Sequence, residues 1–477
     1  MSDQSKTKKI ISAGIGYILG SVLVKGIAFI TTPIFSRLLT TEEFGVFNTF
    51  ISYESILAMF IGFQFAGCLK NAKIKYANDS AGIDAFFSHL IVLMIFHSAL
   101  VLIIVNLFPS LVMNITGIDS VFMLNLLVLT CLGNSAMTVY TSFVSLEYQY
   151  KKYILISVIN AIANVVLSLL FILVVMTNDK SSARLFGYII PYIGILIFVV
   201  ITAFRKKFPN ICDQKKYCRF AYGFCTPLIP NGFAEVMLTQ YSKLSVAKHC
   251  GASEMGIYSL SYNVYSIVAT VKLGMDYIIG PFYFDKRSEG DFESLRRMFG
   301  FYSRSLAVIT SLVMLVTPEI VRIIGDKEYY DARLSAIPLI AVSFFSFLCY
   351  MISQEEYYVQ KPVLVSVISV ASMILNILLC SIFVPSLGGV GAAYCTLIAF
   401  VFMFVFHFVV TKIILKSESF SWLNLFIDGA FVVFMSVVSM LIVDNNLFRF
   451  VAIVINLIVA SLFMLKNLKC VSKLIKR

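Results

Sequence analysis

Two stretches of the chain share most of their letters: EYQYKKYILISVI, which begins at Glu147, and EYYVQKPVLVSVI, which begins at Glu356. They agree at seven of thirteen positions and lie 209 residues apart. A second pair, TEEFGVF from Thr41 and ASEMGIY from Ala252, lies 211 residues apart. Two nearly equal separations from different parts of the chain indicate an internal duplication.

The composition is that of an integral membrane protein. Of the 477 residues 59% are hydrophobic and 13% are charged, and the mean hydropathy is +0.89. This is more apolar surface than a soluble core buries. The first apolar run, from Ile10 to Leu39, lacks a cleavage pattern after a short apolar core, so we expect a retained span and not a signal peptide. The ten cysteines show no C-x-x-C spacing and predict buried apolar side chains.

Fourteen apolar runs are long enough to cross a bilayer, which takes about 20 helical residues. They lie near residues 10–38, 43–67, 83–108, 119–145, 152–176, 184–204, 220–246, 256–281, 300–323, 334–353, 362–384, 389–411, 423–443 and 448–465. We therefore expect an all-α integral membrane protein with two parallel six-helix repeats and two C-terminal helices. The predicted parts are an N-terminal lobe (1–204), a basic cytoplasmic linker (205–219), a C-terminal lobe (220–411), and two additional helices with a basic tail (412–477).

Basic residues are distributed unevenly between the predicted loops. With the N-terminus inside, 27 of the 38 Lys and Arg residues fall in cytoplasmic segments, eight fall outside, and three lie within spans. Cytoplasmic loops favour Lys and Arg, so this pattern predicts both termini in the cytoplasm. The net charge of +12 then indicates orientation and contact with anionic headgroups, and not nucleic-acid binding. The run DKRSEGDFESLRRMFGFYSR from Asp285 predicts a short amphipathic helix on the cytoplasmic surface.

A repeat of six spans has a functional consequence. An even number of helices leaves both copies in the same orientation, and such parallel repeats occur in transporters, with substrate sites near the midplane between the halves. A duplicated scaffold without a transport role is the alternative. It would leave the charged residues inside the spans as an unexplained cost.

Two longer stretches resemble a known family. GYILGSVLVKGIAFITTPIFSRLLTTEEFGVFNTF from Gly16 and PLIPNGFAEVMLTQYSKLSVAKHCGASEMGIYSLSYNVYSIV from Pro227 look like polysaccharide repeat-unit flippases of the Wzx type. These belong to the multidrug/oligosaccharidyl-lipid/polysaccharide exporter superfamily. The resemblance covers nearly the whole chain and is most specific in PIFSRLLTTEEFG, which places Arg37 in a motif at the first external loop.

The resemblance implies a fold and a substrate. It implies two six-helix lobes around a central cavity, and an undecaprenyl-pyrophosphate-linked oligosaccharide moved from the cytoplasmic to the outer leaflet of the bacterial cytoplasmic membrane. Its product would serve surface polysaccharides such as O-antigen and lipopolysaccharide. Membrane lipids, a polysaccharide polymerase and chain-length machinery are the implied partners. No cofactor is expected other than a proton or sodium gradient.

Six charged residues inside predicted spans are the candidates for function. Each costs roughly 2.5–3.5 kcal/mol at mid-helix, and such a side chain normally faces a partner or a water-filled cavity. The candidate cations for binding the pyrophosphate are Lys25, Lys243 and Lys272, and the candidate carboxylates for ion coupling are Glu54, Glu235 and Asp276.

Mutual neutralisation is the alternative role for some of these charges. Lys272 and Asp276 are four residues apart on one helical face, and Lys25 and Glu54 have similar depths in neighbouring spans. A separation of 211 residues places Val236 opposite Lys25 and Tyr265 opposite Glu54, so the duplication did not give both halves these charges. His89 and His97 are eight residues apart, which favours packing or interhelical hydrogen bonds over a metal site.

Two competing functions are considered. A multidrug exporter of the same superfamily, coupled to sodium or protons, would favour carboxylates without three intramembrane lysines. A membrane-bound polymerase or glycosyltransferase would need a sizeable external loop with catalytic acids, and no predicted loop exceeds about twenty residues. The chain also has no glycine-rich phosphate loop, which argues against ATP hydrolysis.

Overall fold

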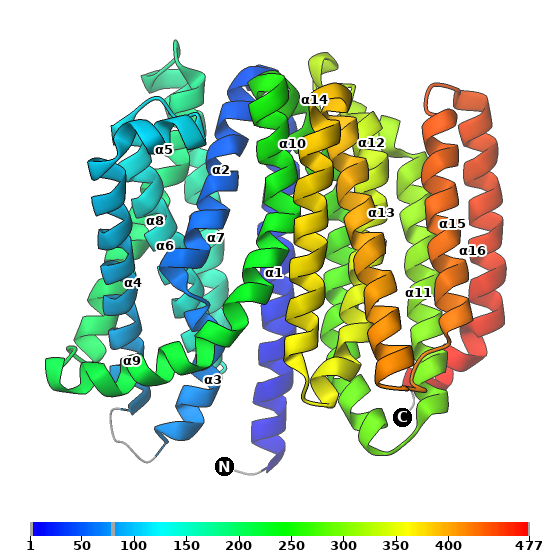
Figure 1. Cartoon of the computed structure of the whole chain (residues 1–477), viewed down its shortest axis with the longest axis horizontal. Helices are drawn as coiled ribbons and strands as arrows, with labels where there is room; N and C mark the ends of the chain where they lie inside the picture. The colour runs from blue at the N-terminus through cyan, green and yellow to red at the C-terminus, as the bar shows by residue number, and fades with distance from the viewer. Residues whose placement is uncertain (1–2, 78–81, 476–477) are drawn as a thin grey trace. The chain divides into compact units, whose positions relative to one another are not determined.

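The computed structural model describes residues 3–77 and 82–475, and every regular element in these residues is helical (Figure 1). In chain order the α-helices are α1 (Asp3–Leu38), α2 (Thr41–Gly62), α3 (Phe65–Lys75), α4 (Gly82–Leu107), α5 (Pro109–Thr116), α6 (Val121–Ser145), α7 (Tyr150–Leu170), α8 (Lys180–Lys206), α9 (Ile211–Cys225), α10 (Ile229–Ser288), α11 (Phe292–Leu315), α12 (Thr317–Ile324), α13 (Ala332–Tyr358), α14 (Pro362–Phe408), α15 (Trp422–Leu441) and α16 (Asn446–Ile475). Short π-helices, η1 (Phe171–Val175) and η4 (Val409–Ile414), extend α7 and α14, and the 3₁₀ turns are η2 (Thr226–Leu228) and η3 (Lys327–Tyr329).

The predicted number of spans agrees with these helices. Ten helical stretches of the described residues are long and apolar enough to cross a membrane. Two of them each contain two spans, because α10 breaks at Gly251 and α14 breaks at Gly388, where φ is 87° and 58°. Helices α1 and α16 supply the other two predicted spans. The all-α fold class with about 14 helices is therefore confirmed.

The duplication is visible in short elements as well as in spans. Helices α5 and α12 each have eight residues, carry a proline in their first two positions and end before a glycine, Gly117 or Gly325. Helix α2 begins after its N-cap residue Thr40, and the second segment of α10 begins after Gly251, 211 residues later. The two halves therefore repeat the same order of long helices, short helices and breaks.

The opening match of the sequence is shifted relative to this structural repeat. The turn between α6 and α7 contains Tyr148 in the left-handed region (φ 56°), and the turn between α13 and α14 contains Gln360 in the same region (φ 57°). These two turn residues are 212 positions apart, whereas the matching letters are 209 apart. The difference of three residues is close to one helical turn. The turn is duplicated, but the matching letters are not structurally equivalent.

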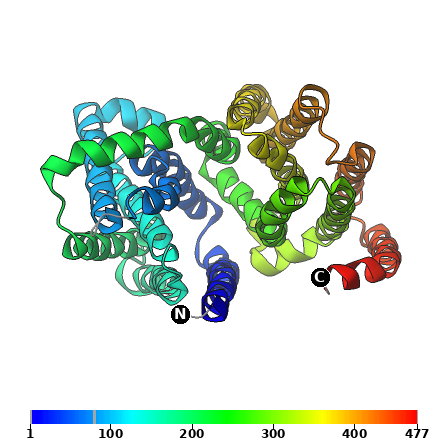
Figure 2. The same ribbon diagram turned by 90° about the horizontal axis from the view of Figure 1, so that it is seen from below.

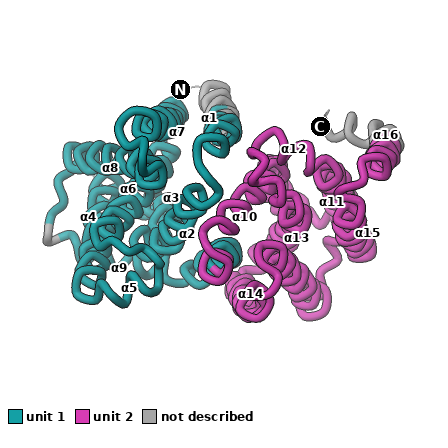
Figure 3. The backbone as a smooth tube through the Cα atoms, turned by 90° about the horizontal axis from the view of Figure 1, so that it is seen from above, with its two compact units in different colours: residues 1–244 teal, residues 245–477 magenta. Residues whose placement is uncertain are grey.

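The chain forms two compact units, Met1–Leu244 and Ser245–Arg477 (Figure 3). The core of unit 1 is built by α2, α3, α4, α6, α8 and α9, and includes the stacked rings of Phe87 and Phe143, whose centroids are 4.3 Å apart. Unit 2 is organised around α13, which packs against α11, α14 and α15 and is the most buried of the candidate spans among the described residues. The lobe boundaries expected from the sequence stay a prediction.

Two local expectations differ from the structure. The basic linker at 205–219 was expected as a loop, but it contains most of α9, which crosses the ends of α3 and α4 and packs on both (Figures 1 and 2). The surface helix expected at 285–304 is absent from the described residues: α10 continues to Ser288 and α11 begins at Phe292 after a tight turn. At 205–219 the amphipathic segment packs on other helices, and at 285–304 it continues two long helices. Composition alone does not distinguish these arrangements from a loop or a separate surface helix.

Gly251 gives a test of the break in α10. Its φ of 87° and ψ of 175° lie in a region that only glycine adopts readily, and a Cβ atom there would meet no atom within 4 Å. Gly251→Ala should therefore cost about 1–3 kcal/mol through backbone strain alone. We expect a lower unfolding midpoint for the purified variant in detergent. Gly274→Ala is the matched control, because Gly274 is helical and also open to space, so alanine should keep or raise the midpoint. Equal midpoints for both variants would contradict this account.

Candidate functional site

A buried carboxylate lies in the interior of unit 1. Glu54 on α2 is 2% exposed, and its Oε1 accepts a hydrogen bond of 2.6 Å from Nδ2 of Asn134 on α6. A buried carboxylate is costly unless it is paired, and a neutral amide compensates the charge only in part. Glu54, considered above as a partner of Lys25, is thus held by a neutral donor. Such a carboxylate gains from binding a proton or a cation.

Two facing rows of polar side chains continue from this point between α7 and α8, which pack against each other. Residues four apart share one face of a helix. Helix α7 carries Asn160, Asn164 and Ser168 at this spacing, and α8 carries Arg184, Tyr188 and Tyr192. The rings of Tyr188 and Tyr192 lie 5.1 Å apart, and Tyr188 also contacts Phe47 of α2 at 5.6 Å between centroids. Together with Glu54 and Asn134, these residues form what we call the polar column of unit 1.

Arg184 is the cation of the polar column. It is 8% exposed, and its Nη1 donates to Asn164 Oδ1 at 2.8 Å and to the Ser168 hydroxyl. The guanidinium group also lies over the rings of Phe35 and Phe47, at 4.0 and 4.2 Å from their centroids. Within the described residues it forms no ion pair and its Nε has no hydrogen-bond partner. Arg184 is therefore a buried cation without a carboxylate beside it.

Arg184 was not among the predicted site residues, because the predicted span began at residue 184 and Arg184 was counted with the external loop. Helix α8 begins earlier, at Lys180, after Asp179 caps it by accepting from the Ser182 N–H at 3.0 Å. The motif D-x-x-S was the available signal for this start. It would have placed Arg184 in the second turn of the helix.

Lys272 and Asp276 form an ion pair along α10. Lys272 Nζ lies 2.9 Å from Asp276 Oδ2, and the two side chains are 18% and 10% exposed. The ammonium group also lies 5.5 Å from the ring centroid of Tyr350 on α13. The neutralising alternative weighed for this pair is thus realised in the structure. Their separate roles in binding pyrophosphate and coupling an ion stay predictions.

The other predicted residues lie on α1 and on the first segment of α10. Lys25 is exposed on α1, and Lys243 is half-buried on α10. Glu235 is exposed and accepts a hydrogen bond of 3.2 Å from Asn231. Arg37 is exposed in the last turn of α1, where its Nη1 donates to the Pro33 carbonyl at 3.4 Å. Glu54 and Arg184 both lie in the interior of unit 1. A cavity shared by Lys25, Lys243 and Lys272 stays a prediction.

Two buried glutamates at the end of α13 were not predicted, because the sequence analysis placed them in a loop. Glu355 is 1% exposed and receives Arg287 Nε at 3.1 Å as well as the hydroxyls of Tyr283 and Ser419. Glu356 is fully buried, and its Oε1 lies 2.7 Å from Nδ1 of His407 on α14. These contacts join α10, α13 and α14 within unit 2, so we interpret them as structural.

The histidines of α4 make the interhelical contacts that their spacing favoured. His89 Nε2 lies 3.0 Å from the Asn210 carbonyl, and His97 Nε2 lies 2.7 Å from the Tyr222 hydroxyl of α9. Both rings also contact backbone carbonyls, of Ala85 and Ile61, through Nδ1. The prediction of interhelical hydrogen bonds is confirmed, and these bonds fasten α9 to α4.

The fold is that of transporters of the multidrug/oligosaccharidyl-lipid/polysaccharide exporter superfamily. The lipid II flippase MurJ in an inward closed conformation matches with a TM-score of 0.72 at 14% identity, over 97% of this chain and all of that chain. An inward-facing multidrug resistance transporter of the MATE family matches with a TM-score of 0.64 at 14% identity, over 83% of this chain and 95% of that one. A transporter of the same superfamily from Pyrococcus furiosus matches with a TM-score of 0.57 at 15% identity, over 86% of this chain and 96% of that one.

The sequence itself shows the family. The family described as polysaccharide biosynthesis protein matches residues 11–274, and the chain belongs to this family. An uncharacterized membrane protein of Haemophilus influenzae is 22% identical over 314 residues, which are 64% of this chain and 72% of that protein. The resemblance noted from the quoted stretches is thus confirmed. Family and fold together support a flippase of this superfamily, and a transporter rather than an enzyme.

The Lys272–Asp276 pair can be tested by a double-mutant cycle. Lys272→Met leaves the Asp276 carboxylate buried without its partner, whereas Lys272→Met with Asp276→Leu removes both charges. We expect the single variant to have the lower unfolding midpoint. The loss should be below the roughly 3–5 kcal/mol of a fully buried pair, because part of Lys272 is exposed.

The control for this cycle is Lys286→Met. Lys286 lies 2.6 Å from Glu289, but that carboxylate is 57% exposed, so the midpoint should change little. A double variant less stable than Lys272→Met alone would show that packing, and not charge compensation, holds this part of α10.

Proposed function

We propose that the protein is a flippase that moves an undecaprenyl-pyrophosphate-linked oligosaccharide from the cytoplasmic to the outer leaflet of the bacterial cytoplasmic membrane. The proposal rests on the family to which the chain belongs and on the share of the chain that each solved structure matches. The chain belongs to a polysaccharide biosynthesis family, and the lipid II flippase leaves 3% of it unmatched, whereas the first multidrug transporter leaves 17%. A lipid-linked sugar is the substrate class that agrees with both.

The charges of unit 1 support an anionic substrate. A pyrophosphate that enters a low-dielectric site loses hydration, which fixed cations must replace. At an effective dielectric near 20, a cation about 5 Å from one phosphate charge contributes on the order of 3 kcal/mol. Lys25 is exposed on α1, near the middle of the first predicted span. We assign the larger share of pyrophosphate binding to Lys25 because of this depth, with Lys243 second, and Arg37 to the external end of the path.

The direction and the setting of transport are part of this proposal. The excess of basic residues in alternate loops supports cytoplasmic termini. The flipped product would then serve a polymerase and its chain-length machinery on the outer side, as in the synthesis of O-antigen or another surface polysaccharide. We further propose that a proton or sodium gradient drives the cycle through Glu54, with Glu235 and Asp276 as the other candidates.

An ion-coupled multidrug exporter is the second candidate. The fold is shared with multidrug transporters, and the buried Glu54 is a carboxylate of the kind that binds cations. A membrane-bound polymerase or glycosyltransferase ranks below both, since no segment between helices of the described residues forms an extramembrane domain. Accumulation of a cationic dye in vesicles that contain the protein would favour the exporter.

The substitution Lys25→Glu tests both the flippase activity and the proposed role of Lys25 in binding the pyrophosphate. The purified protein is reconstituted into liposomes with a lipid-linked oligosaccharide, and a glycosidase added outside reports how much has crossed. We expect Lys25→Arg to retain activity and Lys25→Glu to lose at least about tenfold, since repulsion replaces an attraction worth up to about 3 kcal/mol. Lys151→Glu is the control, an exposed cation at the start of α7.

Surface polysaccharide in a flippase-deficient strain, measured beside the amount of protein in the membrane, gives the same comparison in cells. Normal polysaccharide from well-expressed Lys25→Glu protein would contradict the role of Lys25. With the unaltered protein, a glycosidase-accessible fraction no larger than that of liposomes without protein would contradict the flippase itself.

Two substitutions of Glu54 distinguish a role in ion coupling from a role in folding. Glu54→Gln keeps an oxygen that accepts from Asn134, so we expect normal insertion and stability but loss of the acceleration that an ion gradient gives. Glu54→Leu leaves the Asn134 amide without its acceptor and should cost about 1–3 kcal/mol of stability. The measurement is flipping with and without a pH or sodium gradient, together with the unfolding midpoint. Full gradient-driven activity in Glu54→Gln would exclude the coupling role.

A further inference from the structure

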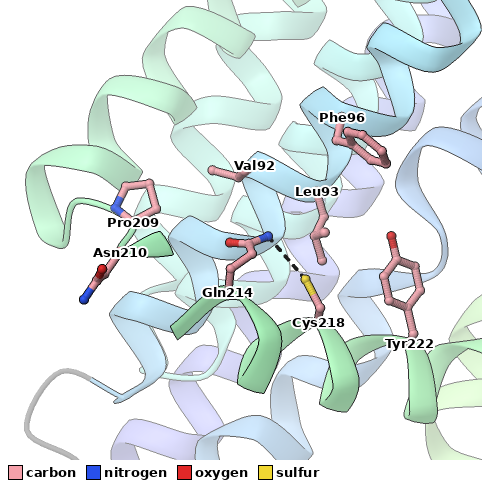
Figure 4. Close-up of a pocket in the computed structure, with 8 residues that line it drawn as sticks. All are labelled: Val92, Leu93, Phe96, Pro209, Asn210, Gln214, Cys218 and Tyr222. Carbon is pink, nitrogen blue, oxygen red and sulfur yellow. Dashed lines mark hydrogen bonds between the residues drawn. The ribbon is translucent and has the colours of Figure 1, made fainter. Parts of the chain in front are cut away.

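A pocket of about 470 Å³ lies between α4 and α9 in unit 1 (Figure 4). Its lining comes from α4, from the segment before α9 and from one face of α9, and consists of Val92, Leu93, Phe96, Pro209, Asn210, Gln214, Cys218 and Tyr222. Its size falls within the roughly 300–1,000 Å³ of ligand sites. Phe96 is 55% exposed, so the pocket reaches the surface of the unit. Neither the polar column nor the predicted charges lie in it.

Three polar groups of the pocket are engaged by the protein. The Tyr222 hydroxyl is hydrogen-bonded to His97, and the Asn210 carbonyl lies 3.0 Å from His89 Nε2. Gln214 donates to the Cys218 sulfur at 3.3 Å along α9, as Figure 4 shows. A hydrocarbon chain matches the apolar side chains of the lining, whereas a sugar or a phosphate does not.

Cations flank the pocket on α9. Lys215 and Arg219 follow the lining residues Gln214 and Cys218 by one position, which places them about 100° further around the helix. Both are exposed, and neither forms an ion pair with any residue that the structure describes. Lys207, also exposed, precedes the pocket segment Pro209–Asn210 in the chain. An apolar slot with cations at its edge is complementary to an anionic amphiphile.

We propose that this pocket binds one acyl chain of an anionic phospholipid, whose phosphate group contacts Lys215 and Arg219. The lipid would hold α9 against α4 as a resident of the protein and would not be transported. We favour a phospholipid over the polyprenyl carrier because a polyprenyl chain is much longer than an acyl chain, and a pocket of about 470 Å³ covers only a short segment of hydrocarbon. The proposal needs only that unit 1 lies in a membrane, and it does not depend on the transported substrate.

Brominated lipids test the occupant directly. The chain has a single tryptophan, Trp422 in unit 2, so Trp422→Phe with Phe96→Trp puts the only indole of the full-length protein at the pocket. The purified variant is placed in phosphatidylcholine nanodiscs that contain increasing amounts of dibromo-phosphatidylglycerol or dibromo-phosphatidylcholine. Each surface cation contributes about fivefold to binding of an anionic lipid. After screening by salt, we expect the relative association constant to favour phosphatidylglycerol by roughly tenfold.

Charge variants in the same background locate the headgroup. Lys215→Gln with Arg219→Gln should bring the preference close to unity. The control, Lys151→Gln with Lys152→Gln, removes the same charge from exposed positions at the start of α7 and should keep the preference. Cys218→Phe fills the pocket and should reduce quenching by both lipids. Lys215 and Arg219 are exposed, so we expect their replacement to leave folding intact. The charge variants therefore test the proposal even if the Cys218→Phe variant does not fold.

Three results would overturn the proposal. The first is equal quenching by the two lipids in the parent variant. The second is a preference for phosphatidylglycerol that survives in the Lys215/Arg219 double variant or in a folded Cys218→Phe protein, which would indicate general attraction to the surface. The third is more efficient displacement of the brominated lipid by undecaprenyl phosphate than by phosphatidylglycerol, which would make the carrier lipid the occupant.

Discussion

A backbone N–H or C=O group without a partner costs several kcal/mol in hydrocarbon, so each span must stay helical and the chain can break a long helix only between two spans. Both interior breaks of long helices occur at glycine, Gly251 and Gly388. The break at Gly388 frees the N–H of Gly389, which donates to Glu254 Oε1 at 3.1 Å. At the start of α2, Thr40 and Glu43 form a reciprocal capping box, with bonds of 3.2 and 2.9 Å.

The two capping glutamates are the duplicated residues of the second sequence match, since Glu43 and Glu254 are 211 positions apart. Glu43 closes the first turn of its own helix, whereas Glu254 reaches from the second segment of α10 to the break in α14. Both satisfy backbone groups that a helix terminus leaves without partners. The duplicated letters thus encode the same physical task, done locally in one half and between helices in the other. This is why the pair TEEFGVF and ASEMGIY keeps its structural register.

The fold was predictable because hydropathy and the distribution of Lys and Arg suffice to count the spans. The predictions that failed concern elements whose structure depends on tertiary contacts. Residues 205–219 were predicted as a linker, but most of α9 lies there. Its packing on α3 and α4 is a tertiary contact that the sequence does not reveal. Glu355 and Glu356 were assigned to a loop, yet α13 continues to Tyr358, where Arg287 pairs with Glu355 and His407 contacts Glu356 through Nδ1. For the site, the pairing of Lys272 with Asp276 followed from a spacing of four, whereas the partner of Glu54 is eighty residues away and no local pattern reveals it.

The described charges are compensated differently in the two units, and this bears on where an anion or a cation would act. In unit 2 three buried charged side chains have ionic partners: Glu355 has Arg287, Asp428 has Arg304, and Arg449 has Glu319, whereas the buried Glu356 is hydrogen-bonded to His407. In unit 1 the buried pair of opposite charges, Glu54 and Arg184, is held by neutral groups. The corresponding positions of unit 2 carry neither charge. Tyr265 corresponds to Glu54, and Ala393, the fifth residue after the break in α14, corresponds to Arg184, the fifth residue of α8. Unit 2 forms without a charge at either position, whereas unit 1 bears the desolvation cost of both. Counter-charge from a ligand or an ion would offset that cost, which is the physical basis for proposing that these side chains act in binding or coupling.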